Sequence, residues 1–408
     1  MPAPDPTRAP LRGVAILAQD VDILGGSERQ TRLIAERLAK RGIHVILLTS
    51  NGRGALGRPK GAWRERRRGV TVYRLPLVGF EAAASAVLAG ERFDVLYAIG
   101  VMMGSFAGRL SRVFEAPVVV KLACSGAYGD VAALEALGAR ARAGALRDLS
   151  EATIVCLSEE LREEADEIGL GARRCKIPNG VAPPPPGEPV FPLGEGGPPT
   201  VLFLGRLTEQ KGVDVLLDAF ARVEPESSED APALLLAGEG PAREELEAQA
   251  DRLGIAERVV FLGRRADVWG LLRGATLCCL PSRGEGISNA LLEALVAGCP
   301  VVASNIPANA EVLEGEAGLL AQPEDHEDLA AQLTRLLSDP ELRERLSKAG
   351  QERIAERYAL DVVASSYEEL FLELPRKPRP ALGELGPRFL GARAASARRV
   401  LGRLLPGA

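Results

Sequence analysis

Histidine is nearly absent from this chain of 408 residues, which contains only His44 and His326. Two histidines make a histidine-based zinc site or a Ser-His-Asp triad improbable. Six cysteines are present, but their spacing matches no metal-binding motif, and most stand in apolar, strand-like runs. We therefore expect buried free thiols and no bound metal.

Long apolar runs are also missing. No stretch approaches the ~20 residues that a membrane-spanning helix needs, and the N-terminal "MPAPDPTRAPLRG" lacks the apolar core of a signal peptide. A net charge of −5 argues against a dedicated nucleic-acid binder, which is normally basic. The composition, 46% hydrophobic and 26% charged, is typical of a soluble globular protein. The chain is therefore expected to be cytoplasmic.

Short apolar runs alternate with helical patterns along most of the chain. The first series includes "GVAILAQ" (13–19), "HVILLTS" (44–50) and "DVLYAIG" (94–100), and a second series begins with "TVLFLGRL" (200–207). Strands that are apolar on both faces and alternate with helices indicate parallel sheets covered on both sides. The predicted fold class is α/β, with two doubly wound, Rossmann-like domains facing a central cleft.

Changes in composition mark the predicted boundaries. The first domain covers residues 1–181, a Pro- and Gly-rich linker covers 182–199, and the second domain covers 200–355. A helical segment follows over 356–374, and residues 375–408 form a tail with eight Lys and Arg against one Glu.

The tail has two interpretations. Its second half has the pattern of a basic amphipathic helix, which favours contact with an anionic membrane surface or a partner, and "WRERRRG" (63–69) is a second signal of that kind. The alternative is a poorly ordered end without such a role.

The stretch "RGEGISNALLEALVAG" (283–298) predicts an anion site at the start of a helix. Ser288 is the expected N-cap, and Gly298 the expected end. Gly284 and Gly286 allow the backbone to approach a ligand, and the free amides near 287–290 would point at it. The expected buried stripe of this helix is Leu291, Leu292 and Leu295.

Two carboxylates flank this helix start, Glu285 in the loop and Glu293 within the helix. Paired carboxylates first suggest acid/base hydrolysis. However, helical side chains lean back toward the N-terminus, so Glu293 can reach hydroxyls of a phosphate-bearing ligand. We interpret both residues as hydroxyl acceptors that need positive charge nearby.

That charge is found in "FLGRLTEQKG" (203–212). Arg206 follows a buried strand directly after Gly205, and Lys211 precedes the next helix. A guanidinium fork and a compact ammonium together suit a diphosphate, and ligands of α/β sheets bind at this end of the strands.

A dinucleotide-dependent oxidoreductase is disfavoured. Gly25 and Gly26 follow the first strand, and "AGEG" (237–240) follows another, but neither has the G-x-G-x-x-G spacing. The second strand ends in "LTSN", without an acidic residue for a ribose.

Several motifs occur together in a characteristic order. They are Gly-Gly-Ser-Glu after the first strand, "IPNGV", "GRLTEQKG", "LAGEGP", "FLGRRADV" and the E-x7-E of "PSRGEGISNALLEALVAGCPVVAS". This order resembles the retaining family 4 glycosyltransferases (glycosyltransferase group 1), from about Gly13 to Leu370. The resemblance implies a GT-B fold whose helix over 356–374 crosses back to the first domain. It also implies transfer of a sugar from a nucleotide diphosphate sugar to a saccharide, lipid-linked or small-molecule acceptor, without a metal or cofactor.

The resemblance assigns roles to individual residues. Arg206 and Lys211 match positions that bind the donor diphosphate, Glu285 matches the residue facing the donor sugar, and Glu293 matches the ligand of the ribose hydroxyls. Arg206, Lys211 and Glu285 are the predicted catalytic residues. The other predicted donor-binding residues are Gly26 in the first-domain loop, Gly205, Arg264 beside the nucleobase, Gly286, Ile287, Ser288 and Asn289.

The chain departs from the family pattern at two places. Many relatives carry a histidine after the strand equivalent to "PVVVKLA", where this chain reads "CSGAYGD" (124–130). Lys121, Ser125 and Asp130 are candidate acceptor-side residues, with Ser125 as a substitute for the histidine, and a cap or surface charge as the alternative for each. The usual Gly-Gly after "VVAS" is replaced by "IPANAE" (306–311).

Two other functions are compatible with these motifs. One is a nucleotide-sugar epimerase or hydrolase of GT-B fold, and the other is a non-catalytic nucleotide-sugar binding protein. The intact pair Glu285 and Glu293, together with Arg206 and Lys211, argues against the second. The motifs leave the base and sugar of the donor open.

Overall fold

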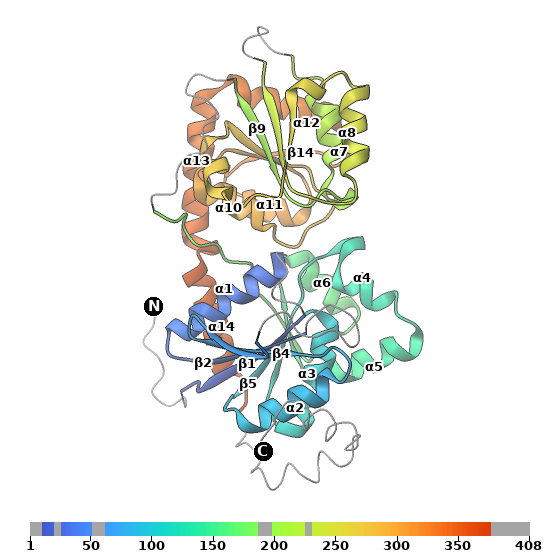
Figure 1. The fold of residues 1–408 in the computed structure, drawn as a ribbon, viewed down its shortest axis with the longest axis vertical. Coiled ribbons are helices and arrows are strands. Elements are labelled where there is room, and N and C mark those ends of the chain that lie inside the picture. The colour runs from blue at the N-terminus through green and yellow to red at the C-terminus, as the bar shows by residue number, and fades with distance from the viewer. Residues whose placement is uncertain (1–9, 20–25, 51–61, 187–197, 225–230, 377–408) are drawn as a thin grey trace. The chain divides into compact units, whose positions relative to one another are not determined.

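The computed structural model describes residues 10–19, 26–50, 62–186, 198–224 and 231–376 (Figure 1). It divides into two compact units. The first contains the chain up to Ala123, Gly129–Ile177 and the chain from Ala364 onward, and the second contains Cys124–Tyr128 and Pro178–Val363. The predicted basic tail lies outside the described residues from 377 onward.

The first unit is built on an eight-stranded sheet of order β3-β4-β2-β1-β5-β6-β7-β8. Its strands are β1 Gly13–Ala18, β2 His44–Ser50, β3 Arg64–Arg67, β4 Val70–Leu75, β5 Val95–Ile99, β6 Val118–Lys121, β7 Thr153–Cys156 and β8 Arg173–Lys176. All neighbouring strands are parallel except β3, which pairs antiparallel with β4. Strands β1 and β7 are buried along their whole length, as expected for a parallel sheet between helix layers.

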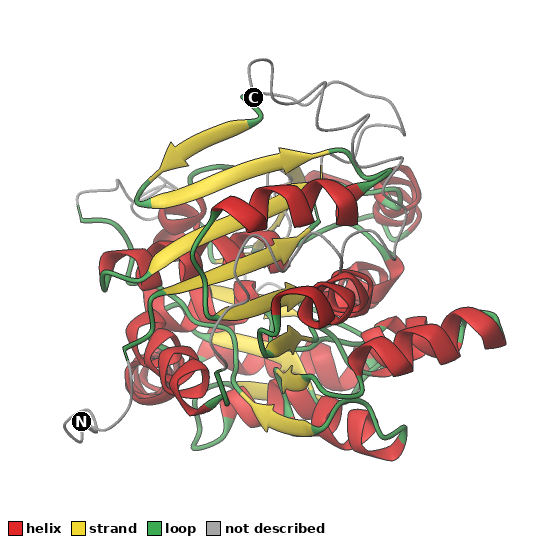
Figure 2. Ribbon diagram, turned by 90° about the horizontal axis from the view of Figure 1, so that it is seen from below, coloured by secondary structure: helices red, strands yellow, loops and turns green. Residues whose placement is uncertain are grey.

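Helices cover both faces of this sheet (Figure 2). They are α1 Gly26–Lys40, α2 Phe80–Gly90, α3 Gly100–Phe114, α4 Asp130–Glu135, α5 Ala139–Leu149 and α6 Glu159–Glu167. The C-terminal part of α14 (Leu360–Glu373) also belongs to this unit, where Tyr367 and Phe371 pack on Tyr97 of β5 with ring centroids 5.3 and 5.7 Å away.

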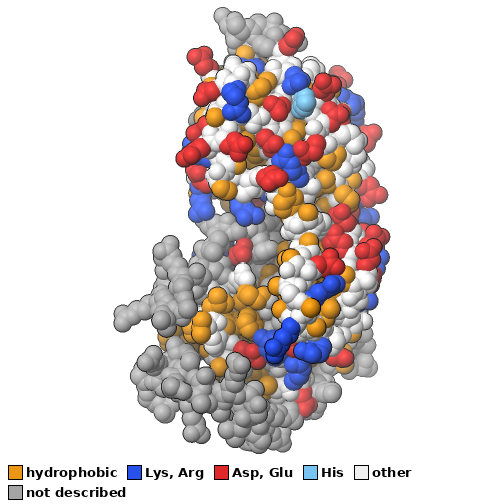
Figure 3. Space-filling model, turned by 90° about the vertical axis from the view of Figure 1, so that its right-hand side faces the viewer, with side chains coloured by type: hydrophobic (Ala, Val, Ile, Leu, Met, Phe, Trp, Pro, Cys, Tyr) orange, Lys and Arg blue, Asp and Glu red, His pale blue; other side chains and the backbone are white. Residues whose placement is uncertain are grey.

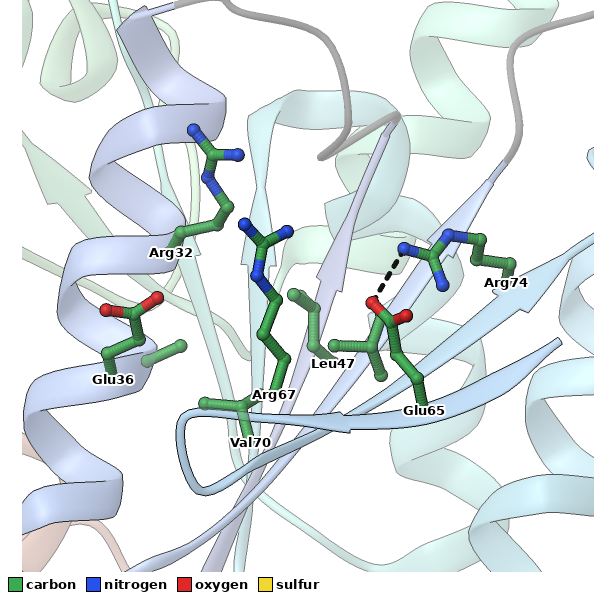
Figure 4. Close-up of a pocket in the computed structure, with 9 residues that line it drawn as sticks. Arg32, Glu36, Leu47, Glu65, Arg67, Val70 and Arg74 are labelled. Atoms are coloured by element: carbon green, nitrogen blue, oxygen red, sulfur yellow. Dashed lines mark hydrogen bonds and ion pairs between the residues drawn. The ribbon is translucent and has the colours of Figure 1, made fainter. Parts of the chain in front are cut away.

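The arginine-rich segment that follows Trp63 forms strand β3 of an edge hairpin, which the residue pattern did not predict. Figure 4 shows Arg67 of β3 and Arg32 of α1 directed to the same side of the hairpin. Buried Arg74 of β4 forms an ion pair with Glu65 at 2.8 Å, which satisfies its charge. Charged side chains on an edge strand oppose pairing with a second sheet.

The second unit is built on a six-stranded parallel sheet of order β11-β10-β9-β12-β13-β14. Its strands are β9 Thr200–Leu204, β10 Ala233–Ala237, β11 Val259–Gly263, β12 Leu277–Leu280, β13 Val301–Ser304 and β14 Leu319–Ala321. Its α-helices are α7 Val213–Phe220, α8 Arg243–Arg252, α9 Val268–Gly274, α10 Asn289–Ala297, α11 Pro307–Leu313, α12 His326–Ser338 and α13 Pro340–Arg353. Shorter helical turns are η1 Gly126–Tyr128, η2 Glu209–Lys211, η3 Ala256–Arg258 and the π-helical turn η4 Ile354–Tyr358. The prediction of two doubly wound parallel sheets is confirmed.

The six cysteines form no disulfide, and Cys156, Cys278, Cys279 and Cys299 are buried. Within the described ranges, no helix is long and apolar enough to cross a membrane. In the same part of the chain, no group of three His, Cys, Asp or Glu side chains could hold a metal ion.

Candidate functional site

The second sheet reverses its strand order between β9 and β12. From β9 the chain proceeds to β10 and β11 on one side, whereas β12 is followed by β13 and β14 on the other. The helices that follow β9 and β12 therefore leave toward opposite faces, and ligands of α/β sheets bind at the carboxyl end of such a switch point. Arg206 and Lys211 follow β9, and Glu285 follows β12.

Lys211 and Glu285 form an ion pair at this point. Both side chains are largely buried, with exposed fractions of 16% and 11%, and Ser282 Oγ donates a second hydrogen bond to Glu285 Oε1 at 2.9 Å. An ammonium group has three donors, so Lys211 can keep this pair and still donate to a phosphate oxygen. Glu285 thus holds the ammonium group of Lys211 in place.

Arg206 precedes Lys211 in the same segment after β9, but its environment is different. Its side chain is exposed, and its guanidinium makes no ion pair or side-chain hydrogen bond with the described residues. A guanidinium that is not already engaged keeps all five donors for a bidentate contact with a phosphate.

Helix α10 begins at the same edge. Ser288 is its N-cap residue by position, as predicted, but its side chain makes no capping hydrogen bond. The helix ends at Gly298, whose φ of 76° suits glycine, and the predicted stripe of Leu291, Leu292 and Leu295 is buried. The N-terminal end of α10 carries the positive end of the helix dipole, which favours an anion there.

Glu293 lies one turn further into α10 and is buried. It stands on the helix that begins at this edge, so one helix carries both N-terminal backbone amides and a carboxylate. Such an arrangement suits a ligand that carries phosphate and hydroxyl groups next to each other.

Three polar side chains from distant parts of the chain hold the loop before α10. Ser125 Oγ donates to the carbonyl of Glu285 at 3.0 Å, Asn179 Nδ2 donates to the carbonyl of Ile287 at 2.9 Å, and Gln210 Nε2 donates to the carbonyl of Gly284 at 2.9 Å. These bonds fix the backbone that carries Glu285. Asn179 lies in the motif "IPNGV" and Gln210 in "GRLTEQKG", but neither motif by itself indicates that these side chains hold the loop.

Ser125 belongs to the short segment Cys124–Tyr128, which packs as part of the second unit. Cys124 forms an antiparallel bridge with Gly286, and Ser125 is only 2% exposed. The hydroxyl proton of Ser125 is engaged by the Glu285 carbonyl, so in this structure Ser125 supports the loop. Its predicted contact with an acceptor stays a prediction.

Arg283 connects this loop to the segment that carries Lys211. It makes a bidentate pair with Asp214 at 2.9 and 2.7 Å and pairs with Glu324 at 2.6 Å. Burial alone would raise the pKa of Asp214, but the hydrogen bonds and charge of Arg283 outweigh it, and the pKa is lowered. Arg283 therefore holds the loop through its hydrogen bonds and ion pairs.

Two glycines explain the close packing of this edge. Gly212 has a φ of 63°, and a Cβ there would lie 2.1 Å from the Pro281 carbonyl oxygen. A Cβ on Gly238 of "AGEG" would lie 1.7 Å from the Gly205 carbonyl oxygen. These glycines allow backbone segments to touch each other, which accounts for "AGEG" without a dinucleotide.

The remaining predicted donor-binding residues are more scattered. Arg264 is exposed directly after β11 in the second unit, and Gly26 is the exposed first residue of α1 in the first unit.

In place of the usual Gly-Gly, "IPANAE" begins helix α11. Buried Asn309 of α11 donates to the carbonyl of Ser304, and Ser304 Oγ donates to the carbonyl of Ser282 at 2.5 Å, so this segment also supports the Glu285 loop.

The acceptor-side candidates Lys121 and Asp130 lie together in the first unit. Lys121 ends β6 and is buried, and Asp130 begins α4 and accepts a hydrogen bond from the amide of Ala123 at 2.7 Å. Burial lowers the pKa of Lys121 to about 7, and the charge of Asp130 opposes this by a smaller amount.

This burial predicts a pH-dependent stability. The pKa of Lys121 is lower in the folded chain than the 10.5 of an exposed lysine. Between pH 7 and 10.5 the unfolded chain then binds more protons, so stability rises with pH in this window and is flat below it. We expect the unfolding free energy of the wild type, relative to Lys121→Met, to rise by up to about 1.4 kcal/mol per pH unit from pH 7 to 8.5.

Urea unfolding of the wild type and of Lys121→Met at several pH values measures this difference in unfolding free energy. Burial raises the pKa of Cys156 and Cys299 to about 12, so both proteins lose stability above about pH 8.5, where unfolded thiols ionise. The difference between the two proteins removes that common effect. A difference that does not change from pH 6 to 8.5 would contradict the assignment.

A second prediction concerns Asn179. Asn179→Ala removes the donor to the buried carbonyl of Ile287, so we expect a loss of about 1–3 kcal/mol in unfolding free energy. Asn305→Ala, at an exposed asparagine of the same unit, is the control and is expected to change stability by less than about 0.5 kcal/mol. Equal unfolding midpoints for the two variants would show that Asn179 does not hold the loop.

The two doubly wound parallel-sheet units have the architecture of the GT-B fold. Family models match both units: "Glycosyl transferase 4-like domain" over residues 25–180 and "Glycosyl transferases group 1" over residues 190–353. The chain belongs to the glycosyltransferase group 1 family.

Individual relatives agree with this. The chain is 36% identical to phosphatidyl-myo-inositol mannosyltransferase of Mycobacterium leprae, over 68% of this chain and 73% of that protein. It is 28% identical to the lipopolysaccharide core biosynthesis glycosyltransferase LpsD of Rhizobium meliloti, over 85% and 95%. Among solved structures, HepE of Anabaena in complex with UDP-glucose matches with a TM-score of 0.71 at 22% identity, over 88% of this chain and all of that one, which shows a shared fold.

Proposed function

We propose that the chain transfers a sugar from a nucleotide diphosphate sugar to a saccharide, lipid-linked or small-molecule acceptor, with retention at the anomeric carbon and without a metal ion. The observation that carries this proposal is the convergence of Arg206, the Lys211–Glu285 pair and the start of α10 at one switch point. Two cations and the positive end of the α10 dipole can together neutralise a diphosphate, which in this proposal removes the need for a metal.

The relatives support the two substrate classes. HepE was solved with UDP-glucose, which is a nucleotide diphosphate sugar. LpsD is named for lipopolysaccharide core biosynthesis, and the mycobacterial relative for mannosyl transfer to phosphatidyl-myo-inositol. These names favour an acceptor that carries a sugar or a cyclitol.

The proposed reaction takes place on one face of the donor sugar. The bond between the anomeric carbon and the diphosphate oxygen breaks, and a bond from the acceptor oxygen to the same carbon forms. The acceptor proton passes to the departing diphosphate. Lys211, Arg206 and the amides of α10 stabilise the negative charge that develops on the leaving group, which is an electrostatic contribution to catalysis.

The two carboxylates have separate roles in this proposal. Glu285 accepts hydrogen bonds from hydroxyls of the donor sugar, and Glu293 accepts them from the ribose. Neither transfers a proton, which agrees with Glu285 being held by Lys211 and Ser282.

The test has two steps. Thermal shift with a panel of nucleotide sugars identifies the donor, because a ligand that binds the folded state raises apparent stability. NMR of the reaction mixture, with and without acceptor, then follows the anomeric signal. Retained configuration that requires acceptor supports the proposal. Turnover without acceptor would identify an epimerase or hydrolase, and binding without turnover would identify a nucleotide-sugar binding protein.

We also propose contact with an anionic membrane surface through the basic tail 375–408, with the hairpin at Trp63–Gly69 as a second contact. Arg66 and Arg67 of the hairpin are exposed, and basic residues near an anionic surface contribute about 1 kcal/mol each. Deleting residues 375–408 is expected to reduce co-sedimentation with anionic vesicles at least tenfold, and neutral vesicles are the control. Unchanged sedimentation with anionic vesicles would refute the role of the tail.

A further inference from the structure

A narrow groove lies at the edge of the first sheet, between helix α1 and the hairpin of β3 and β4 (Figure 4). Leu47 of β2 and Val70 and Val72 of β4 form its apolar floor. Its volume of about 20 Å³ exceeds the ~10–15 Å³ that one water needs, but it is far below the ~300–1,000 Å³ of a pocket for a whole small molecule. The groove therefore accommodates one small group of a ligand, and not a sugar ring or a nucleotide.

The tip of the hairpin is held against α1. Arg68 and Gly69 form its two-residue turn, with φ values of 49° and 86°. Such a turn favours Asn or Gly at both positions, and an arginine there is unusual. Arg68 forms an ion pair with Glu36 of α1 at 3.1 Å, and a Cβ on Gly69 would lie 3.2 Å from the Cβ of Ala39. These two contacts fix the spacing between β3 and α1, so the groove is a defined part of the fold.

Both carboxylates that line the groove already have a cationic partner. Glu36 pairs with Arg68, and Glu65 pairs with the buried Arg74 at 2.8 Å. Arg32 stands four residues before Glu36 on α1, a spacing at which a pair within the helix is common. Glu36 is instead engaged by the hairpin. The negative charge of the groove is thus neutralised by arginines at its two ends.

Two further guanidinium groups line the groove, those of Arg32 and Arg67. Arg32 is half-buried and Arg67 is exposed, and neither forms an ion pair with a residue in the described ranges. Figure 4 shows their side chains directed to the same side of the groove. Two like charges so placed repel each other, and an anion between them relieves that repulsion. Each guanidinium can donate two parallel hydrogen bonds, which suits a phosphate with several free oxygens.

The distribution of charge along the chain also favours an anion here. On the second unit, Figure 3 shows Lys and Arg interspersed with Asp and Glu. By contrast, residues 62–75 contain five Arg and one Glu, although the whole chain has a net charge of −5. A surface that carries one sign of charge attracts ligands of the opposite sign.

We propose that Arg32 and Arg67 form a binding site for a phosphate monoester in this groove. The tip of the hairpin lies at the amino end of β4, so the site stands away from the carboxyl ends of the strands. It belongs to a different unit from the proposed diphosphate site and does not depend on the transferase function. A diffuse contact of the hairpin with a membrane would treat all of its exposed arginines alike, whereas this site assigns binding to two side chains. The monoester is that of a soluble phosphate ester or of a lipid head group.

Calorimetry with inorganic phosphate at low ionic strength tests the site. The titrations use the full chain with Lys211→Ala, because phosphate can also bind the cations of the proposed diphosphate site. Arg32→Gln and Arg67→Gln are then added one at a time. Glutamine is a good helix former and Arg67 is exposed, so both variants are expected to fold. Each is expected to weaken phosphate binding at least about fivefold, which allows for the partial exposure of the groove.

Arg66→Gln is the matched control, because it removes the same charge from the same strand. Side chains alternate along β3, so Arg66 faces away from the groove that Glu65 and Arg67 line. Its affinity for phosphate is expected to stay within about twofold. An equal loss in Arg66→Gln and Arg67→Gln would overturn the proposal, because it would show a diffuse attraction to the basic hairpin. Unchanged affinity in both Arg32→Gln and Arg67→Gln would also overturn it.

Vesicles separate the two sources of the phosphate. Phosphatidic acid presents a monoester and phosphatidylglycerol a diester, each at the same fraction in a neutral lipid. A preference for phosphatidic acid in co-sedimentation, lost in Arg67→Gln and kept in Arg66→Gln, supports the site and identifies a lipid head group. Phosphate binding that needs Arg32 and Arg67, without this preference, supports the site and identifies a soluble ester. Absence of both saturable phosphate binding and the lipid preference overturns the proposal.

Discussion

Replacing Lys211 with alanine is expected to weaken binding of the nucleotide diphosphate sugar roughly 10- to 150-fold. The reason is the loss of one charged hydrogen bond to the diphosphate, worth about 1.5–3 kcal/mol. The rate of transfer should fall further, by about 10²–10³ in kcat, because in the proposed mechanism Lys211 also stabilises the charge that develops on the leaving group. Calorimetry with the donor and initial rates with acceptor measure the two effects separately.

The control for this variant is Lys348→Ala, which removes an exposed lysine of α13 in the same unit. It is expected to leave donor affinity and rate within about twofold. Urea unfolding of Lys211→Ala shows whether the loss of the ion pair with Glu285 also lowers stability. Unchanged donor affinity in a folded Lys211→Ala protein would remove Lys211 from the site.

Glu285→Gln is expected to separate catalysis from binding of the leaving group. The amide keeps the shape of the side chain and can still accept from Ser282, but it removes the charge that the proposed mechanism places at the donor sugar. We expect kcat to fall about 10²–10³-fold. Affinity for the free nucleoside diphosphate should be unchanged or higher, because the substitution removes a negative charge next to Lys211.

Glu209→Gln is the matched control, since Glu209 is exposed in the turn that ends at Lys211. It is expected to leave both quantities unchanged within about twofold. A Glu285→Gln protein that lost nucleoside diphosphate affinity and rate by the same factor would contradict the separate roles of Glu285 and Lys211.

The local features of the site could be predicted from the sequence. Helix α10 was predictable because its apolar spacing, its polar start and Gly298 all lie within a short stretch. The alternation of apolar runs with helical patterns likewise predicted two doubly wound parallel sheets. In each case the signal is a periodicity, which depends only on neighbouring residues.

The side chains that hold the loop before α10 could not be predicted from a periodicity. The bond from Ser125 to Glu285 spans 160 residues of sequence, and the bond from Asn179 to Ile287 spans 108. Such contacts depend on how loops meet in the folded unit and leave no periodic signal. Strand β3 was missed for a related reason: its arginines show no apolar alternation, and its extended form comes from backbone pairing with β4.

A diphosphate site at the switch point of the second sheet should distinguish ligands with a diphosphate from ligands without one. Once the donor is known, calorimetry of its nucleoside and of the nucleoside diphosphate is carried out on the wild type and on Lys211→Ala. We expect the substitution to weaken binding of the nucleoside diphosphate at least tenfold and to leave binding of the nucleoside unchanged. The same loss for both ligands, or none for either, would contradict a diphosphate site between β9 and β12.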